Sequence, residues 1–268
     1  MTSPHASSID TTDLQFQVDK AFAPDKESHW KYPKDHDGWV HAHNTIRGDL
    51  QTAEDCFQAI QGRKRAEDPS SMTLKAWEVD CLQTVFDAHY EFVKMHHENE
   101  DHIITPWLNT RINLPAKLTD DHEDIVGAMK SLQSKIRGLK PGDERQASME
   151  TLLAEWKPYA TNMREHLQEE EDIGLPLMRA YFLPKEYSKV IQKLVRGESK
   201  LMTGCFVHRM GEERCRNEFM KEQGIPFFVW YLVFSGSIKL YESTVGAAIE
   251  ALQSGVEPPP PKRGLLGC

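Results

Sequence analysis

The sequence has no hydrophobic run long enough to cross a membrane. Its most apolar stretch, residues 225–234 (IPFFVWYLVF), covers ten residues, whereas a transmembrane helix needs about 20. We predict that this stretch forms a buried helix. The first ten residues are polar and lack the apolar core of a secretion signal. These two absences favour a cytoplasmic protein without a membrane partner.

Cysteine is also scarce, and its spacing excludes the common structural uses of thiols. The five cysteines form an odd number and contain no Cys-x-x-Cys pair, so neither a disulfide framework nor a zinc ribbon is indicated. A chain of 268 residues is long enough to form a stable core without cross-links. We therefore expect reduced thiols. For Cys205 and Cys215, two buried thiols are favoured over a redox pair.

The chain lacks a cluster of positive charge. It has 32 Lys plus Arg against 41 Asp plus Glu, a formal net charge of −9, and the basic residues are scattered. Such a charge repels phosphate backbones, so nucleic acid is not expected as a partner. Hydrophobic residues make up 39% and charged residues 27%, which is typical of a globular protein and excludes a collagen-like or disordered chain.

Histidine, by contrast, is abundant, with twelve in the chain. Apolar residues recur at helical spacing in four segments, and alternating β-branched runs are almost absent. The segments are residues 38–61, 71–109, 119–139 and 143–181. A Thr119-Asp120-Asp121 cap is expected to open the third segment. Four amphipathic helices with short connections predict an all-α protein built on an up-down-up-down four-helix bundle.

Four regions are expected along the chain. They are a loosely ordered N-terminal arm (1–37), the four-helix bundle (38–182), a helical extension that packs on the bundle (183–253) and a flexible, proline-rich tail (254–268). The extension has helical segments near 185–196, 208–222 and 226–253. A protein partner, if the chain has one, is expected to bind through this extension.

Each of the four bundle segments places a histidine on its apolar face, where an unpaired imidazole is costly. These histidines are His43, His96, His122 and His166. A single histidine on such a face is usually a hydrogen-bonded core residue. In two segments, however, a glutamate follows four residues later, at Glu100 and Glu170, and therefore lies on the same helix face. A proline follows six residues after each glutamate, so the pattern repeats and indicates two pseudo-equivalent helix pairs.

Imidazoles and carboxylates that project from facing helices form a pocket for first-row transition metals. Four histidines and two glutamates suit two ions, with two imidazoles for each ion and the glutamates bridging them. Two neighbouring buried glutamates would otherwise be protonated or repel each other, and bound cations remove that penalty. The residues therefore predict a two-ion site with positions open to water or oxygen-derived ligands.

The four stretches around these histidines read HNTIRGDL (43–50), HHENEDHIITPWL (96–108), HEDIVGAM (122–129) and HLQEEEDIGLPLM (166–178). Together they resemble hemerythrin-like proteins with an HHE cation-binding domain, over about residues 38–182. The resemblance implies a four-helix bundle with a non-haem di-iron centre, in which oxo or hydroxo and carboxylate groups bridge two iron ions. The metal ligands that it implies are His43, His96, Glu100, His122, His166 and Glu170.

The sequence departs from the oxygen-carrying branch of that family. The branch has a fifth histidine one turn along the third helix, whereas Leu118 and Val126 stand one turn to either side of His122. The resemblance therefore implies the members with four histidines and two glutamates, which are associated with iron sensing, nitric oxide or oxidative stress responses, and iron-centre repair. Dioxygen, nitric oxide and peroxide are the expected small ligands, whereas reversible oxygen carriage is not expected.

Several alternatives stay open at this point. His97 lies on a more polar face than His96 and is a less favoured ligand in its place. His89 is either an auxiliary ligand or, preferably, a core histidine, and Tyr159 either donates to a bound ligand or packs in the core. The alternative functions are a di-iron oxidase, peroxidase or iron-centre repair enzyme, and an interaction bundle that metal merely stabilises. No residue is assigned a catalytic role.

Overall fold

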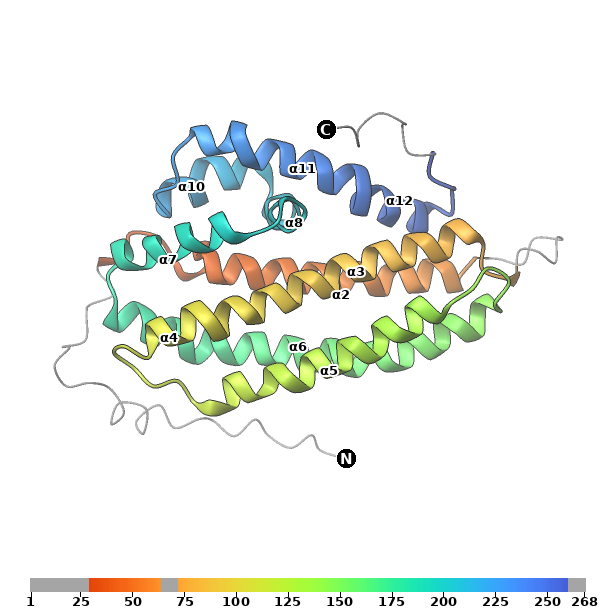
Figure 1. The fold of residues 1–268 in the computed structure, drawn as a ribbon, viewed down its shortest axis with the longest axis horizontal. Helices are drawn as coiled ribbons and strands as arrows, with labels where there is room; N and C mark the ends of the chain where they lie inside the picture. Colours follow the sequence, from red (N-terminus) through yellow and green to blue (C-terminus); the bar gives the residue numbers. More distant parts are fainter. Residues whose placement is uncertain (1–28, 64–71, 260–268) are drawn as a thin grey trace.

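A computed structural model of the protein describes residues 29–63 and 72–259. These residues form helices and no β-strand; a single isolated bridge joins Thr73 and Glu144. Four long helices dominate the fold (Figure 1): α2 (Gly38–Gln61), α3 (Ala76–Asn99), α5 (Ala116–Gly138) and α6 (Arg145–Tyr181). Within the ring that they form, α2 packs against α6 and α3, and α5 packs against α6 and α3. The predicted all-α bundle is confirmed.

The bounds of the four long helices agree with the periodicity, apart from the starts of the second and third; α3 begins at Ala76 rather than near residue 71. The second predicted helix runs from α3 through a π-helical turn, Glu100–Ile104, into α4 (Thr105–Leu108). The predicted cap of the third helix was wrong, because α5 begins at Ala116, directly after Pro115. Thr119 is already inside the helix, where its hydroxyl donates to the Ala116 carbonyl at 2.9 Å. A threonine bonded back to its own helix is no longer available as a cap.

A buried aspartate fixes the start of α2. The Asp37 carboxylate accepts hydrogen bonds from the Trp39 backbone N–H at 3.0 Å and from the Tyr187 hydroxyl at 2.6 Å. An N-cap of this kind satisfies a backbone donor that the helix itself leaves free. Because Tyr187 lies in the extension, the same contact ties the extension to the first bundle helix.

Two apolar clusters fill the molecule, and a polar layer separates them. One fills the bundle and is centred on Trp156, whose ring makes edge contacts with Phe57 at 5.5 Å and Phe86 at 5.8 Å. The other joins the opposite end of the bundle to the extension and includes Tyr187 and Phe219. Along α2, α3 and α6, the boundary between the two clusters falls near residues 43, 96 and 166, respectively. The predicted donors therefore lie at this boundary.

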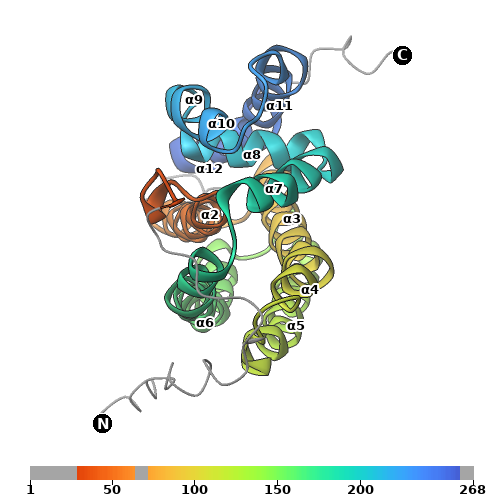
Figure 2. The same cartoon turned by 90° about the vertical axis from the view of Figure 1, so that its left-hand side faces the viewer.

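The C-terminal extension covers the α2 and α3 side of the bundle (Figure 2). Its elements are α7 (Pro184–Gly197), α8 (Lys200–Met210), α9 (Glu212–Arg214), α10 (Met220–Glu222), α11 (Ser235–Tyr241) and α12 (Ala247–Ser254), with π-helical turns at Cys215–Phe219, Trp230–Phe234 and Glu242–Gly246. Helix α8 packs on α2, and α12 packs on both α2 and α3. The closest approach of α8 to α11 is at Gly204, where a Cβ atom would collide with the Ser237 carbonyl.

The apolar stretch 225–234 is helical only in part and is not fully buried. Its helical part begins at residue 228. Trp230 and Phe234 are buried, but 78% of Phe227 and 76% of Leu232 are exposed. The prediction of a buried helix was therefore wrong for one face of the stretch. The reason is its position in the outer layer of the extension, where neighbouring helices cover only one side.

The predicted arm and tail fall largely outside the described residues, which leave out 1–28 and 260–268. In the described part of the arm, the Trp30 indole donates to the Arg179 carbonyl at 2.9 Å, and the Arg179 guanidinium donates to the Tyr32 carbonyl at 2.6 Å. Among the described helices, none combines the length and the apolar character that a membrane crossing requires.

Candidate metal centre

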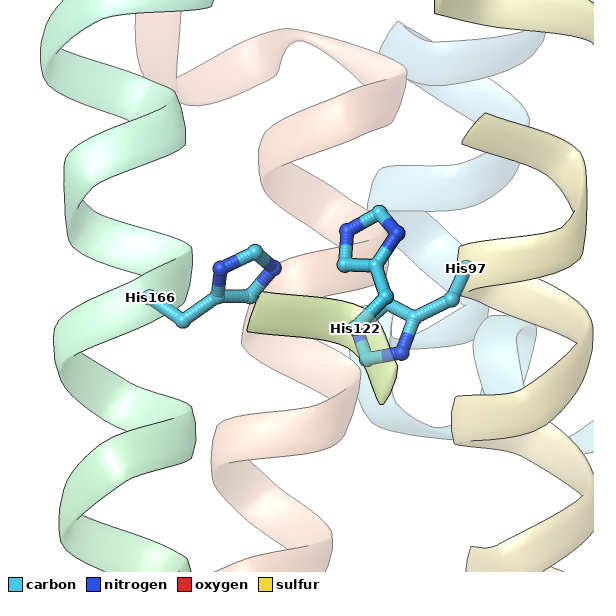
Figure 3. Close-up of side chains that lie close together, drawn as sticks. All are labelled: His97, His122 and His166. Carbon is cyan, nitrogen blue, oxygen red and sulfur yellow. The ribbon is translucent and has the colours of Figure 1, made fainter. Parts of the chain in front are cut away.

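Two groups of metal-binding side chains meet in the polar layer of the bundle. The first group contains His43 from α2, His96 from α3, Glu100 from the π-helical turn and Glu170 from α6. The second group contains His97, His122 and His166, from α3, α5 and α6. Within each group, the candidate donor atoms lie within 4.8 Å of one another, and all seven residues are buried. Figure 3 shows the second group, whose three rings converge from three helices.

The two glutamates span the two groups. The Oε1 atom of Glu100 lies 3.2 Å from the Nε2 atom of His96, and its Oε2 atom lies 3.7 Å from the Nε2 atom of His122. The Oε2 atom of Glu170 lies 3.3 Å from His43 Nε2, and its Oε1 atom lies 3.6 Å from His166 Nε2. Each carboxylate therefore presents one oxygen to each group, which is the arrangement of a bridging ligand.

These separations suit donors that share an ion. Nitrogen and oxygen donors lie about 2.1 Å from a transition metal. Two donors on one ion are therefore about 3.0 Å apart in octahedral geometry and about 3.4 Å apart in tetrahedral geometry. The observed separations of 3.2 to 3.7 Å are close to these values.

Other side chains orient the histidine rings from outside. The Nδ1 atom of His43 donates to Glu171 at 2.8 Å, and that of His122 donates to Asp101 at 2.9 Å. A carboxylate oxygen only accepts, so in both rings Nδ1 carries a proton and Nε2 faces the centre of the site, where a neutral ring presents its lone pair. Such an outer hydrogen bond fixes the tautomer and orientation of a metal-binding imidazole. In the same way, the Trp39 indole donates to Glu100 Oε1 at 2.6 Å.

The atoms that point inward have no hydrogen-bond partner. They are the Nε2 atoms of His43, His96, His97, His122 and His166 and the Oε2 atoms of Glu100 and Glu170. A buried polar atom without a partner costs about 1–3 kcal/mol, and ion pairs of protonated histidines with the glutamates offset only part of that cost. Bound cations would satisfy all of them, and the donor set therefore fits a metal centre.

The pKa values of the site also show that its two buried carboxylates require positive charge nearby. Burial, together with the charge of Glu170, raises the pKa of Glu100 to about 7. Burial would lower the pKa of His122, but Glu170 and Glu100 outweigh it and raise that pKa to about 9. Burial holds the pKa of His97 well below its usual range, so that ring is neutral. Protons thus compensate the carboxylates where a cation would otherwise do so.

All six residues predicted as ligands meet in this layer, and the structure adds His97. Only 2% of His97 is exposed, and its ring stacks on His122 with centroids 4.2 Å apart. The sequence argument placed His97 on a polar face because it assumed one buried stripe along the helix. Helix α3 instead packs against α5 as well as α2, so two neighbouring faces are buried. The consecutive histidines His96 and His97 were the available signal.

The π-helical turn also helps to position the side chains of the site. A π-helical turn adds a residue to one turn of an α-helix and often marks a functional site. Here it begins at Glu100, so Asp101 in the next position reaches His122 on α5. Periodicity at 3.6 residues per turn does not reveal such a turn.

His89 and Tyr159 do not join the centre. Their side chains are hydrogen-bonded to each other at 2.8 Å inside the bundle, and both are buried. His89 is therefore a core histidine, as the simpler prediction had it, and the Tyr159 hydroxyl already has a partner. The described cysteines are also apart from the centre, as free buried thiols.

An apolar cavity adjoins the first group of donors. It has a volume of about 60 Å³ and lies between the bundle and the extension, next to Trp39 and His96. Helices α7 and α8 contribute apolar walls, among them Ile191 and Phe206. Glu198 is the one carboxylic acid among the described lining residues, and burial raises its pKa to about 7. The cavity therefore suits small uncharged molecules.

The family of the chain follows from a comparison with known protein families. The model of one family, described as the hemerythrin HHE cation binding domain, matches residues 35–178. The chain belongs to this family. The match covers α2, α3, α5 and nearly all of α6, together with all seven inward-facing donors, so this hemerythrin HHE domain is a cation-binding domain. No curated protein matches the chain, and no solved structure matches it.

Proposed function

We propose that this hemerythrin HHE domain holds a carboxylate-bridged, non-haem di-iron centre and binds or senses dioxygen, nitric oxide or iron in the cytoplasm. The observation that carries the proposal is the set of seven buried, inward-facing donor atoms without partners. Their division into two groups that Glu100 and Glu170 span supports two ions rather than one. Free thiols support a reducing compartment.

The donor count supports iron. Imidazole and carboxylate together suit iron(II), and sites that leave coordination positions open are typical of its oxygen chemistry. If Glu100 and Glu170 were shared, an ion beside His43 and His96 would have four protein donors, and an ion beside the other three histidines would have five. The first group would therefore leave more coordination positions open. The oxygen-carrying branch has its fifth histidine on the third helix, whereas here His97 on the second helix brings the number of histidines to five. The number of ligands therefore no longer argues against reversible oxygen binding.

The apolar cavity supports a diatomic ligand. It touches His96, which belongs to the ion with fewer protein donors. A volume of about 60 Å³ admits a small molecule, since one water needs about 10–15 Å³ on the same measure. Iron, when bound, supplies reversible coordination of dioxygen or nitric oxide. The chain supplies the apolar walls that exclude water, and Trp39 holds Glu100 in place.

Elemental analysis and an optical spectrum of anaerobically purified protein test the proposal. We expect about two iron ions per chain, with oxo-bridge absorption that appears in air. Zinc alone, or no metal, would contradict it. An assay of peroxide consumption on the same sample separates a binding protein from a peroxidase.

A double substitution tests the bridging role. Glu100→Ala with Glu170→Ala should abolish metal content, because each group loses both carboxylate oxygens. The matched control is Glu98→Ala with Glu169→Ala, which removes two glutamates from the same helices outside both donor groups. The control should keep its iron. A Glu100/Glu170 variant that still carries two iron ions would show that these ligands are wrongly assigned.

A further inference from the structure

A second opening of the metal centre differs in character from the apolar cavity. It is an open groove of about 800 Å³ between α3 and α5, lined by residues of these helices and of the π-helical turn and by none of the extension. At its inner end it reaches His97 and His122, which belong to the second donor group. The apolar cavity reaches the first group at His96. Each donor group thus has its own opening.

The groove carries an excess of negative charge. Four carboxylic acids line it, against two lysines, and the charge of His122 at the inner end offsets that of Asp101, to which it is bonded. The acids are Glu98, Asp101, Glu123 and Asp124, and the lysines are Lys94 and Lys130. Lys94 forms an exposed ion pair with Glu98 at 3.0 Å. The uncompensated negative charge therefore lies on α5, where Glu123 and Asp124 outnumber Lys130.

Buried nitrogen atoms at the inner end of the groove are available to bind a cation. Both ring nitrogens of His97 are buried and have no hydrogen-bond partner, although the ring lines the groove. Asp101 stands between the open part of the groove and the buried donors, with 35% of its side chain exposed and its Oδ1 atom bonded to His122. Carboxylates thus continue from the open surface to the buried imidazoles.

We propose that this groove is the route by which divalent metal ions load into the centre, separate from the apolar cavity that admits uncharged ligands. The inference rests on the proposed metal centre. An acidic groove concentrates cations and speeds their association, often by 10-fold or more. A hydrated ion is strongly disfavoured in the apolar cavity, because its walls offer few groups to replace the lost water.

The test measures how fast metal-free protein takes up Fe²⁺ under anaerobic conditions, by stopped-flow mixing at about 0.1 M salt. Trp39 reports arrival through fluorescence quenching, because its indole is hydrogen-bonded to Glu100. The test variant is Glu123→Gln with Asp124→Asn, two exposed residues of the groove. The final metal content is measured after desalting.

A matched control removes the same charge elsewhere. The control combines Asp55→Asn on α2 with Glu150→Gln on α6. Asp55 is 12 residues from His43, about 18 Å along its helix, and Glu150 is 16 residues from His166, about 24 Å along its helix. Both distances exceed the Debye length of about 10 Å at 0.1 M salt. Lys130→Gln provides a change of the opposite sign inside the groove.

We expect the test variant to load about five times more slowly, which is the effect of two charges on a divalent ion that passes about 8 Å from each of them in screened water. The control should load at the normal rate, and Lys130→Gln about twice as fast. All variants should reach the same final metal content, and the differences should vanish at 1 M salt. Equal rates in test and control variants would overturn the route. Failure of the unaltered protein to take up any metal would instead overturn the proposed metal centre.

Discussion

His97 offers the sharpest test of the site, because its replacement should act in opposite directions with and without metal. The ring is buried and neutral, both nitrogens lack partners, and it stacks on His122. His97→Phe keeps a flat ring in that position and removes the two nitrogens. A buried polar group without a partner costs about 1–3 kcal/mol. Allowing for the slightly larger ring, we expect the metal-free variant to be more stable by about 2 kcal/mol.

With metal the sign should reverse. The second donor group keeps only two imidazoles, and loss of a direct ligand should weaken binding of one ion by about 100-fold or more, since even outer-sphere changes cost 10- to 100-fold. A stabilising ligand contributes RT ln(1 + [L]/Kd). The metal-bound variant should therefore lose about 2.7 kcal/mol of metal-linked stability for that ion.

Urea unfolding with a chelator and with excess Zn²⁺ measures both effects, and elemental analysis gives the number of ions per chain. His102→Phe is the control, because His102 is exposed in the same π-helical turn. It should change the free energy of unfolding by no more than about 0.5 kcal/mol, with or without metal. The reasoning fails if His97→Phe destabilises the metal-free protein, or if it binds two ions with unchanged affinity.

Two further predictions concern the attachment of the extension and the start of α2. Gly204→Ala should destabilise the protein by about 1–3 kcal/mol in urea unfolding, because the new Cβ atom would meet the Ser237 carbonyl. The control Gly127→Ala has nothing within 4 Å of the new Cβ atom and should stabilise α5 by up to about 1 kcal/mol. Equal effects of the two substitutions would contradict the packing argument. Burial raises the pKa of Asp37 to about 6 from 3.8, so the folded state binds more protons than the unfolded state between these values, and stability contributed by this group falls as pH rises from about 4 to 6. Asp37→Asn cannot titrate, so its stability relative to the unaltered protein should rise across that window by up to about 3 kcal/mol; a difference independent of pH would refute this.

The local sequence was sufficient for the bundle and for six of the donors that meet in it. Helical periodicity depends only on neighbours in the chain, and a histidine and glutamate four residues apart share a face in any α-helix. His96 with Glu100, and His166 with Glu170, therefore came from spacing alone. The family resemblance pointed to the same residues, and the match over residues 35–178 confirms that family.

Periodicity failed where a helix has more than one covered face. His97 was assigned to a polar face, yet α5 covers it. The stretch 225–234 failed in the opposite way, since its apolar composition suggested burial while Phe227 and Leu232 are exposed at the outer layer. In both cases burial depends on which elements pack nearby, and composition of the segment does not contain that information.

The sequence by itself thus determined the four long helices and the donors that repeat at helical spacing, because these follow from contacts within one turn. The family followed from the motifs around those donors. Only the tertiary structure decided which rings meet in each donor group and that Glu100 and Glu170 span both groups. It also decided that the extension covers an apolar cavity, while an acidic groove between α3 and α5 stays open. Each of these features joins residues far apart in the chain. Their positions are set by how whole helices pack, which no local pattern encodes.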